Sequence, residues 1–151
     1  MKLADAAPEP SASTEQFTVR LSSTRRGARL ARRLTAERLA AWGIPYDSEA
    51  SHAAAAVTAE LTANAITHGR LPGRDFLLSL ARLPGAVRIE VTDTRPERLP
   101  KAAATPPTAL DALEAETGRG LLLVAAYAAK WGCQARDAHT KTVWAEITHP
   151  S

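Results

Sequence analysis

Cysteine, aromatic residues and long apolar runs are all scarce in this chain of 151 residues. The single cysteine, Cys133, excludes an internal disulfide and a cluster of thiolate metal ligands, as is typical of reducing compartments. No run approaches the roughly 18 apolar residues that a membrane-spanning helix needs, and the start MKLADAAPEP lacks the layout of a secretory signal. We therefore expect a cytoplasmic protein without a membrane segment, in which Cys133 is a small packing residue rather than a reactive thiol.

The composition is otherwise that of one globular domain. Hydrophobic residues make up 45% of the sequence and charged residues 23%, while aromatic residues make up only 5%, so the core must be mostly aliphatic. The length suits one domain with a core and is short for two. Residues 1–14 are rich in Ala, Pro and Ser and carry no apolar period. We expect a disordered tail there and one folded domain over residues 15–149.

Positive charge is concentrated early in the chain, although the formal net charge is only +3. One short segment holds the five arginines Arg25, Arg26, Arg29, Arg32 and Arg33. Such a cluster is an electrostatic footprint for a nucleic acid. No aromatic stacking platform or recognisable reading helix accompanies it, so we expect a solvated or partner-binding face and no nucleic-acid binding.

Periodicity and turn residues predict the order of the secondary structure. The predicted elements are a strand over 16–21, a helix to about residue 41, a helix to residue 68, strands over 75–83 and 87–93, a helix over 118–131, and strands over 133–137 and 142–148. Prolines and scattered charges over 94–117 predict a mobile loop. This order predicts an α+β two-layer sandwich, with one mixed, mostly antiparallel sheet and helices on one face.

Capping side chains and glycines set the predicted helix boundaries. Ser23 or Thr24 can cap the first helix, and Asp47 or Ser48 can cap the second. Glycine ends the three helices, at Gly43, Gly69 and Gly132.

In the segment AELTANAITHG, residues 59–69, three polar side chains recur one helical turn apart. They are Glu60, Asn64 and His68, and Asn64 falls inside the apolar stripe of the helix. An amide that is buried without a partner costs roughly 1–3 kcal/mol, so a helix built only for packing should not contain one there. The three side chains could instead line a pocket, where an amide oxygen can bind Mg²⁺ and a carboxylate can accept a proton.

A structural alternative exists for the same three residues. Asn64 and Glu60 could satisfy each other or a neighbouring backbone group, and the helix dipole would favour His68 near the C-terminus.

Two further positions carry chemistry that suits a nucleotide. Asp93 closes a strand, where its carboxylate can accept a hydrogen bond from an exocyclic amine. Gly118 and Gly120 open a helix, whose backbone N–H groups and positive dipole end favour phosphate, and Arg119 between them can neutralise its charge. The structural alternative for the two glycines is an ordinary turn at the start of a helix.

Three segments together resemble a known family, the GHKL superfamily of ATP-binding domains found in DNA gyrase and histidine kinases. AELTANAITHG resembles its N-box, VTDTRP its G1 box and ETGRGLLLV its G2 box, in the family's order. The closing strand KTVWAEI resembles the last box. The strongest resemblance is to the bacterial anti-sigma factor serine/threonine kinases, which implies a Bergerat-type ATP-binding fold.

The resemblance also implies roles for individual residues. Glu60 would be the proton acceptor or water organiser, Asn64 the Mg²⁺ ligand, and Asp93 the acceptor for the adenine amino group. The residues implied to contact ATP are Asn64, His68, Asp93, Gly118, Arg119, Gly120, Leu121 and Thr142. The loop between the G1 and G2 boxes would be a lid over the nucleotide.

The expected function is that of an anti-sigma-type regulator, which phosphorylates a Ser or Thr of an anti-anti-sigma partner and controls a sigma factor. Members of this type often form homodimers. In two places the sequence departs from the family pattern: Thr94-Arg95-Pro96 follows Asp93 in place of the G1 glycines, and Thr140 stands where a Gly is common. These departures favour the alternative of a degenerate module that sequesters a partner without phosphoryl transfer.

Overall fold

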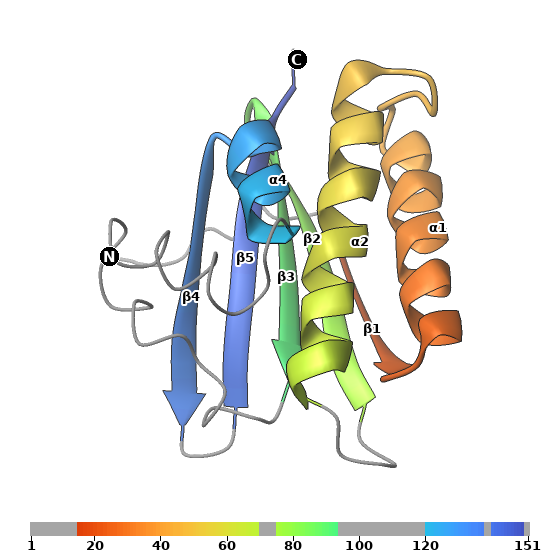
Figure 1. The fold of residues 1–151 in the computed structure, drawn as a ribbon. Coiled ribbons are helices and arrows are strands. Elements are labelled where there is room, and N and C mark those ends of the chain that lie inside the picture. The colour runs from red at the N-terminus through yellow and green to blue at the C-terminus, as the bar shows by residue number, and fades with distance from the viewer. Residues whose placement is uncertain (1–14, 70–74, 94–119, 138–139, 150–151) are drawn as a thin grey trace.

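The computed structural model describes residues 15–69, 75–93, 120–137 and 140–149. Within them the elements are β1 (Gln16–Ser22), α1 (Arg25–Ala41), α2 (Glu49–Gly69), β2 (Asp75–Leu83), β3 (Ala86–Asp93), α4 (Gly120–Tyr127), β4 (Lys130–Asp137) and β5 (Thr140–Thr148) (Figure 1). The expected tail over 1–14 and the expected loop over 94–117 lie outside the described residues.

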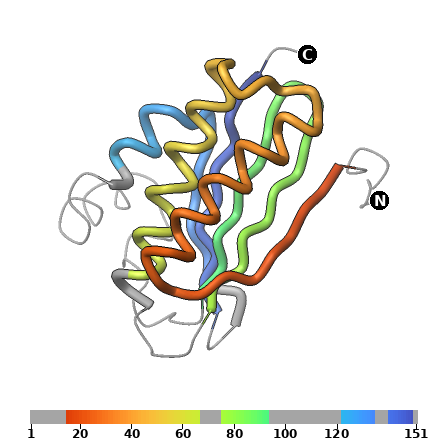
Figure 2. The backbone as a smooth tube through the Cα atoms, turned by 90° about the vertical axis from the view of Figure 1, so that its right-hand side faces the viewer, coloured from red at the N-terminus to blue at the C-terminus, as the bar shows by residue number. Residues whose placement is uncertain are grey.

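The strands form one sheet, and the helices cover one of its faces (Figures 1 and 2). The strand order is β1-β2-β3-β5-β4, and each of these neighbouring pairs is antiparallel. The predicted α+β two-layer sandwich is therefore confirmed, with an antiparallel rather than a mixed sheet. None of the described helices is long and apolar enough to cross a membrane.

The core lies between the sheet and the helices, and it is aliphatic except for a few aromatic rings. Alternate residues of the three central strands are buried against the helices because successive side chains of a strand point to opposite faces. These buried residues are Phe76, Leu78 and Leu80 of β2, Val87, Ile89 and Val91 of β3, and Val143, Ala145 and Ile147 of β5. The same alternation brings Asp93 and Lys141 to the helix-facing side, at one end of the sheet.

The predicted boundaries of the first two helices agree with the structure. The Thr24 hydroxyl accepts a hydrogen bond from the Gly27 N–H at 3.0 Å, and the Ser48 hydroxyl accepts one from the Ser51 N–H at 3.1 Å. Each hydroxyl satisfies a donor in the first turn of a helix that has no partner within the helix. Gly43, after the end of α1, has a φ of 91°, a conformation that glycine adopts without strain.

The predicted end of the third helix is wrong. Helix α4 ends at Tyr127, and residues 130–132 belong to β4. Gly132 does not end a helix: it lies opposite Trp144 of β5, and a Cβ at this position would be 2.8 Å from the Trp144 ring. The absence of a side chain at Gly132 leaves room for that ring. Glycine is required there because β4 pairs with β5, and the local sequence does not contain that information.

Candidate functional site

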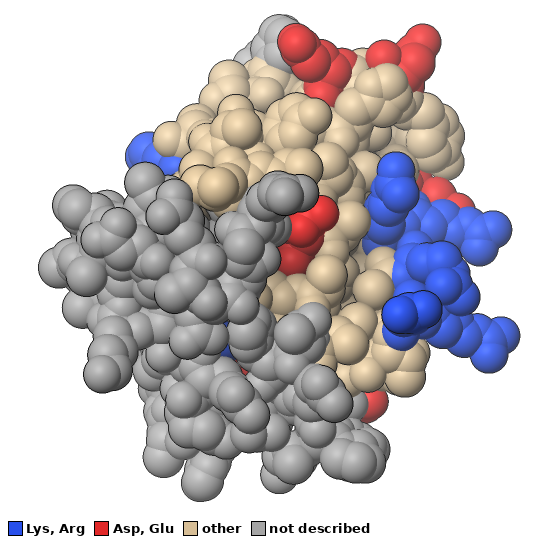
Figure 3. Space-filling view, in the orientation of Figure 1, with Lys and Arg blue, Asp and Glu red and all other residues tan. Residues whose placement is uncertain are grey.

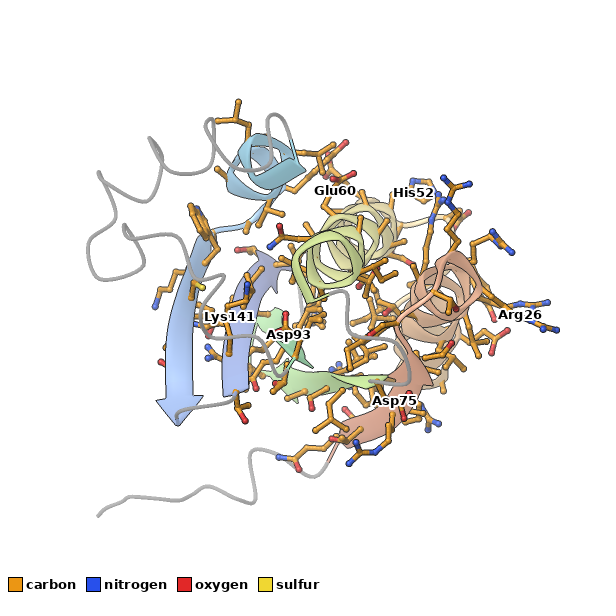
Figure 4. The ribbon with its side chains drawn as sticks, turned by 60° about the horizontal axis from the view of Figure 1, so that its bottom comes forward. Arg26, His52, Glu60, Asp75, Asp93 and Lys141 are labelled. Atoms are coloured by element: carbon orange, nitrogen blue, oxygen red, sulfur yellow. The ribbon has the colours of Figure 1, made fainter. Side chains whose placement is uncertain are left out.

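The side of α2 that faces α4 carries two of the predicted functional residues. Figure 4 shows Glu60 on this side, and Asn64 follows one turn later on the same face. Both residues are half-buried. In Figure 1 the first turn of α4 lies beside α2, and the two helices pack against each other. The described part of the segment resembling the G2 box, residues 120–124, therefore belongs to a helix that packs against the helix carrying the segment resembling the N-box.

The Asn64 side chain has an unsatisfied oxygen. Its Oδ1 atom is buried and accepts no hydrogen bond from the described residues. The alternative in which a nearby backbone N–H satisfies this oxygen is therefore not realised among them. A buried polar atom without a partner costs roughly 1–3 kcal/mol, so such atoms are rare unless they have a function. An amide oxygen with free lone pairs is a suitable ligand for Mg²⁺.

A cation at Asn64 would need further ligands from elsewhere. Among residues 15–69, 75–93, 120–137 and 140–149, no group of three or more His, Cys, Asp and Glu residues could hold a metal ion. Mg²⁺ usually keeps several waters and takes one or two protein ligands plus substrate phosphates. The Asn64 oxygen could therefore be one such protein ligand.

Asp93 and Lys141 meet where β3 ends and β5 begins. The two residues are direct partners in the antiparallel register, and the Lys141 Nζ atom lies 3.9 Å from the Asp93 Oδ2 atom (Figure 4). Asp93 is 5% exposed and Lys141 only 1%. Asp93 was expected in the site, whereas Lys141 was missed. The sequence did contain a pattern that could have placed Lys141 on this face. Val143, Ala145 and Ile147 alternate along β5, and the same alternation extends back to position 141.

Thr142 lies on the other face of the sheet. It is paired with Thr92, and the two hydroxyl oxygens are 2.8 Å apart. Neighbouring residues of a strand point to opposite faces, so the Thr142 side chain points away from the face that carries Asp93. Lys141 is the residue of β5 whose side chain faces Asp93, and the expected contact of Thr142 with the Asp93 network stays a prediction.

Cys133 is also on the helix-facing side, opposite Val143. Burial raises the pKa of its thiol to about 11, an increase that nearby Lys141 reduces and Asp93 reinforces. A thiol with such a pKa is protonated at neutral pH and is a poor nucleophile. This supports the expected role of Cys133 as a packing residue.

Three further predicted residues lie at the ends of helices. His68 is in the last turn of α2, and Gly120 and Leu121 are the first two residues of α4. Gly118 and Arg119 lie outside the described residues, as do the side chains of His68 and Leu121. The roles of these five residues stay predictions.

Comparison with known proteins agrees with this arrangement. A family model described as the histidine kinase-like ATPase domain matches residues 21–147, which is most of the chain and includes every predicted site residue. The chain therefore belongs to the histidine kinase-like ATPase domain family, and the resemblance to GHKL-type ATP-binding domains is confirmed at this level. No curated protein matches the chain.

Proposed function

We propose that this domain binds ATP together with Mg²⁺ beside α2 and acts as a regulatory protein of the anti-sigma factor type. The observation that carries the proposal is the buried Oδ1 atom of Asn64, which accepts no hydrogen bond from the described residues. A site that binds no cation would leave this atom unsatisfied at a cost in stability, whereas a bound cation would offset that cost.

In the proposed site, three parts of the fold bind the adenine, the phosphates and the Mg²⁺. The carboxylate of Asp93 would accept a hydrogen bond from the adenine amino group. Backbone N–H groups from Gly118 to Leu121 would hold the phosphates at the start of α4, with Arg119 offsetting their charge. Asn64 would hold the Mg²⁺, and His68 lies one further turn along α2.

In the proposed kinase reaction Glu60 is the proton acceptor. The hydroxyl oxygen of a partner Ser or Thr forms a bond to the γ-phosphorus of ATP, the bond from that phosphorus to the ADP oxygen breaks, and Glu60 takes the hydroxyl proton. When bound, Mg²⁺ neutralises the charge that develops on the phosphate oxygens. Glu60 suits this role because it lies one turn from Asn64 and is only half-buried, so a partner hydroxyl can reach it.

The proposed partners follow from the resemblance of the three boxes to anti-sigma factor kinases. The substrate would be an anti-anti-sigma protein, and the target of control would be a sigma factor. We further propose that the protein acts in the cytoplasm, as a homodimer.

Two features favour the alternative, a degenerate module that sequesters its partner without phosphoryl transfer. The Asp93 carboxylate already has an ionic partner in Lys141, and Thr94-Arg95-Pro96 follows it where the family has glycines. Both features reduce the room and the hydrogen-bonding capacity that remain for an adenine.

Titration calorimetry with ATP, with Mg²⁺ and then with a chelator, tests the binding proposal. We expect Mg²⁺ to strengthen ATP binding to the wild-type chain and Asn64→Ala to weaken Mg²⁺-dependent binding by at least about tenfold. Gln134→Ala, which removes an exposed amide from β4, is the matched control and should bind as wild type. Equal affinities of wild type and Asn64→Ala would remove Asn64 from the metal role.

A labelled-phosphate assay then distinguishes the two functions. Transfer of the γ-phosphate to a Ser or Thr of an anti-anti-sigma protein, lost in Glu60→Gln, would support the kinase. ATP binding without transfer to any such partner would support the sequestering module.

A further inference from the structure

An open groove lies between α1 and α2. Its volume is about 820 Å³. The groove is separate from the proposed nucleotide site, because Glu60 faces α4 whereas His52 of the groove faces α1 (Figure 4). It is lined by Arg26, Arg29, Leu30, Arg32, Arg33, Ala36, Tyr46, Ser51, His52 and Ala55.

The positive charge of this groove is largely uncompensated. Arg26, Arg29 and Arg32 make no ion pair with any residue that the structure describes. The Arg33 Nε atom lies 3.7 Å from the Glu37 Oε2 atom, but both side chains are at least half exposed, so the pair contributes little to stability. Figure 3 shows the basic side chains gathered on one side of the molecule. Guanidinium groups so arranged favour a ligand with several negative charges.

The groove also exposes apolar side chains. Leu30 is 38% exposed and Tyr46 58%, and they are two of only four large hydrophobic residues exposed in the described part of the chain. Ala36 and Ala55 add small apolar surfaces from the two helices. The groove therefore combines an apolar strip with arginines beside it. It favours a ligand that has one apolar face with negative charges on both sides of that face.

We infer that this groove binds an acidic amphipathic helix of a partner protein. The apolar side chains of such a helix would cover Leu30, Tyr46 and the two alanines, while carboxylates on its flanks would pair with the arginines, each guanidinium being able to hold a carboxylate through two hydrogen bonds. The inference goes beyond the proposed function, because it needs neither ATP nor Mg²⁺.

A nucleic acid fits this groove less well. Its phosphates form an unbroken line of negative charge, about one per 1.7 Å of duplex, which would pass the exposed carboxylate of Glu37 beside Arg33. A phosphate backbone also gives Leu30, Ala36 and Ala55 no apolar partner. The acidic helix satisfies both the charge and the apolar strip.

The test uses fluorescence anisotropy with two labelled synthetic peptides of identical composition. One places leucines at i, i+3, i+4 and i+7 with glutamates on the other positions, and the second has the same residues in an order that puts the leucines on no single face. We expect the full chain to bind the amphipathic peptide at least about tenfold more tightly than the reordered one.

Two groove variants locate the binding. Arg26→Glu/Arg29→Glu should weaken binding of the amphipathic peptide at least about tenfold, and Leu30→Ala/Tyr46→Ala should weaken it severalfold. The control Arg20→Glu/Lys130→Glu makes the same change in net charge at exposed strand positions and should bind as wild type. ATP titration of each variant, which the inference expects to be unchanged, separates this result from failure of the proposed function.

Three outcomes would overturn the inference. Equal binding of the two peptides would show that the groove is a basic patch that does not recognise an amphipathic helix. Wild-type binding by Arg26→Glu/Arg29→Glu would place the peptide elsewhere. A duplex oligonucleotide that binds through the same arginines, in the absence of peptide binding, would identify a nucleic-acid surface instead.

Discussion

The ammonium group of Lys141 lies 3.9 Å from the carboxylate of Asp93, and both side chains are almost completely buried. The two residues come from neighbouring strands and are direct partners in the register of β3 and β5. Asp93 is the residue proposed to bind adenine. Any base that binds there must therefore share the carboxylate with a buried cation, which ties nucleotide affinity to Lys141.

Removal of Lys141 should destabilise the domain. Lys141→Met removes the ammonium group beside the buried Asp93 carboxylate, a loss of about 3 kcal/mol when a buried pair is broken from one side. Urea unfolding followed by circular dichroism measures the loss, with the exposed Lys130→Met as control. Adding Asp93→Asn to Lys141→Met should recover part of the stability, and an unfolding midpoint unchanged by Lys141→Met alone would show that the pair contributes nothing.

Replacement of Asn64 should have the opposite effect on stability. Asn64→Ala removes a buried oxygen that has no hydrogen-bond partner among the described residues, so the free energy of unfolding without nucleotide should stay equal or rise by about 1 kcal/mol. The same urea titration measures it. A structural amide would behave differently: a loss of about 1–3 kcal/mol would mean that Asn64 holds the helix in place and is not reserved for a ligand.

Much of the fold could be predicted because its signals are local. The alternation of Phe17, Val19 and Leu21 located β1, and capping hydroxyls and Gly43 located the ends of α1. Residues 130–132 were misassigned because the run LLLVAAYAAKWG is apolar on all sides and has no period. Their strand conformation comes from pairing with β5, which the local sequence does not contain.

The site was predicted unevenly for a similar reason. Asn64 stood out because a polar amide interrupted an apolar stripe, a pattern visible along a single helix. Lys141 was missed because lysine is almost always exposed, and its burial depends on the partner across the sheet. The face of Thr142 follows from the alternation along β5, which places it on the face of Thr92 and away from Lys141 and Val143.

Gly132→Ala should destabilise the sheet edge. A Cβ at this position would come within 2.8 Å of the Trp144 ring, which also stacks under the Arg88 guanidinium at 4.1 Å. Moving the ring should cost about 1–3 kcal/mol, as overpacking usually does, and should change the tryptophan emission. Urea unfolding followed by fluorescence tests this, with Gln134→Ala on the same strand as control. A wild-type midpoint for Gly132→Ala would show that the ring moves freely.

The Cys133 thiol should make the stability fall at high pH. Its pKa is about 11 in the folded chain and 9.0 as the ordinary value, so between these values the folded state holds a proton that the unfolded state has lost. Stability contributed by the neutral thiol is thus complete below pH 9 and decreases as pH rises toward 11. Unfolding midpoints measured over this range in wild type and Cys133→Ala isolate the effect, because every other titrating group is common to both. The difference between the two midpoints should shift with pH in this window and stay constant below it, and parallel curves throughout would mean that the thiol titrates normally.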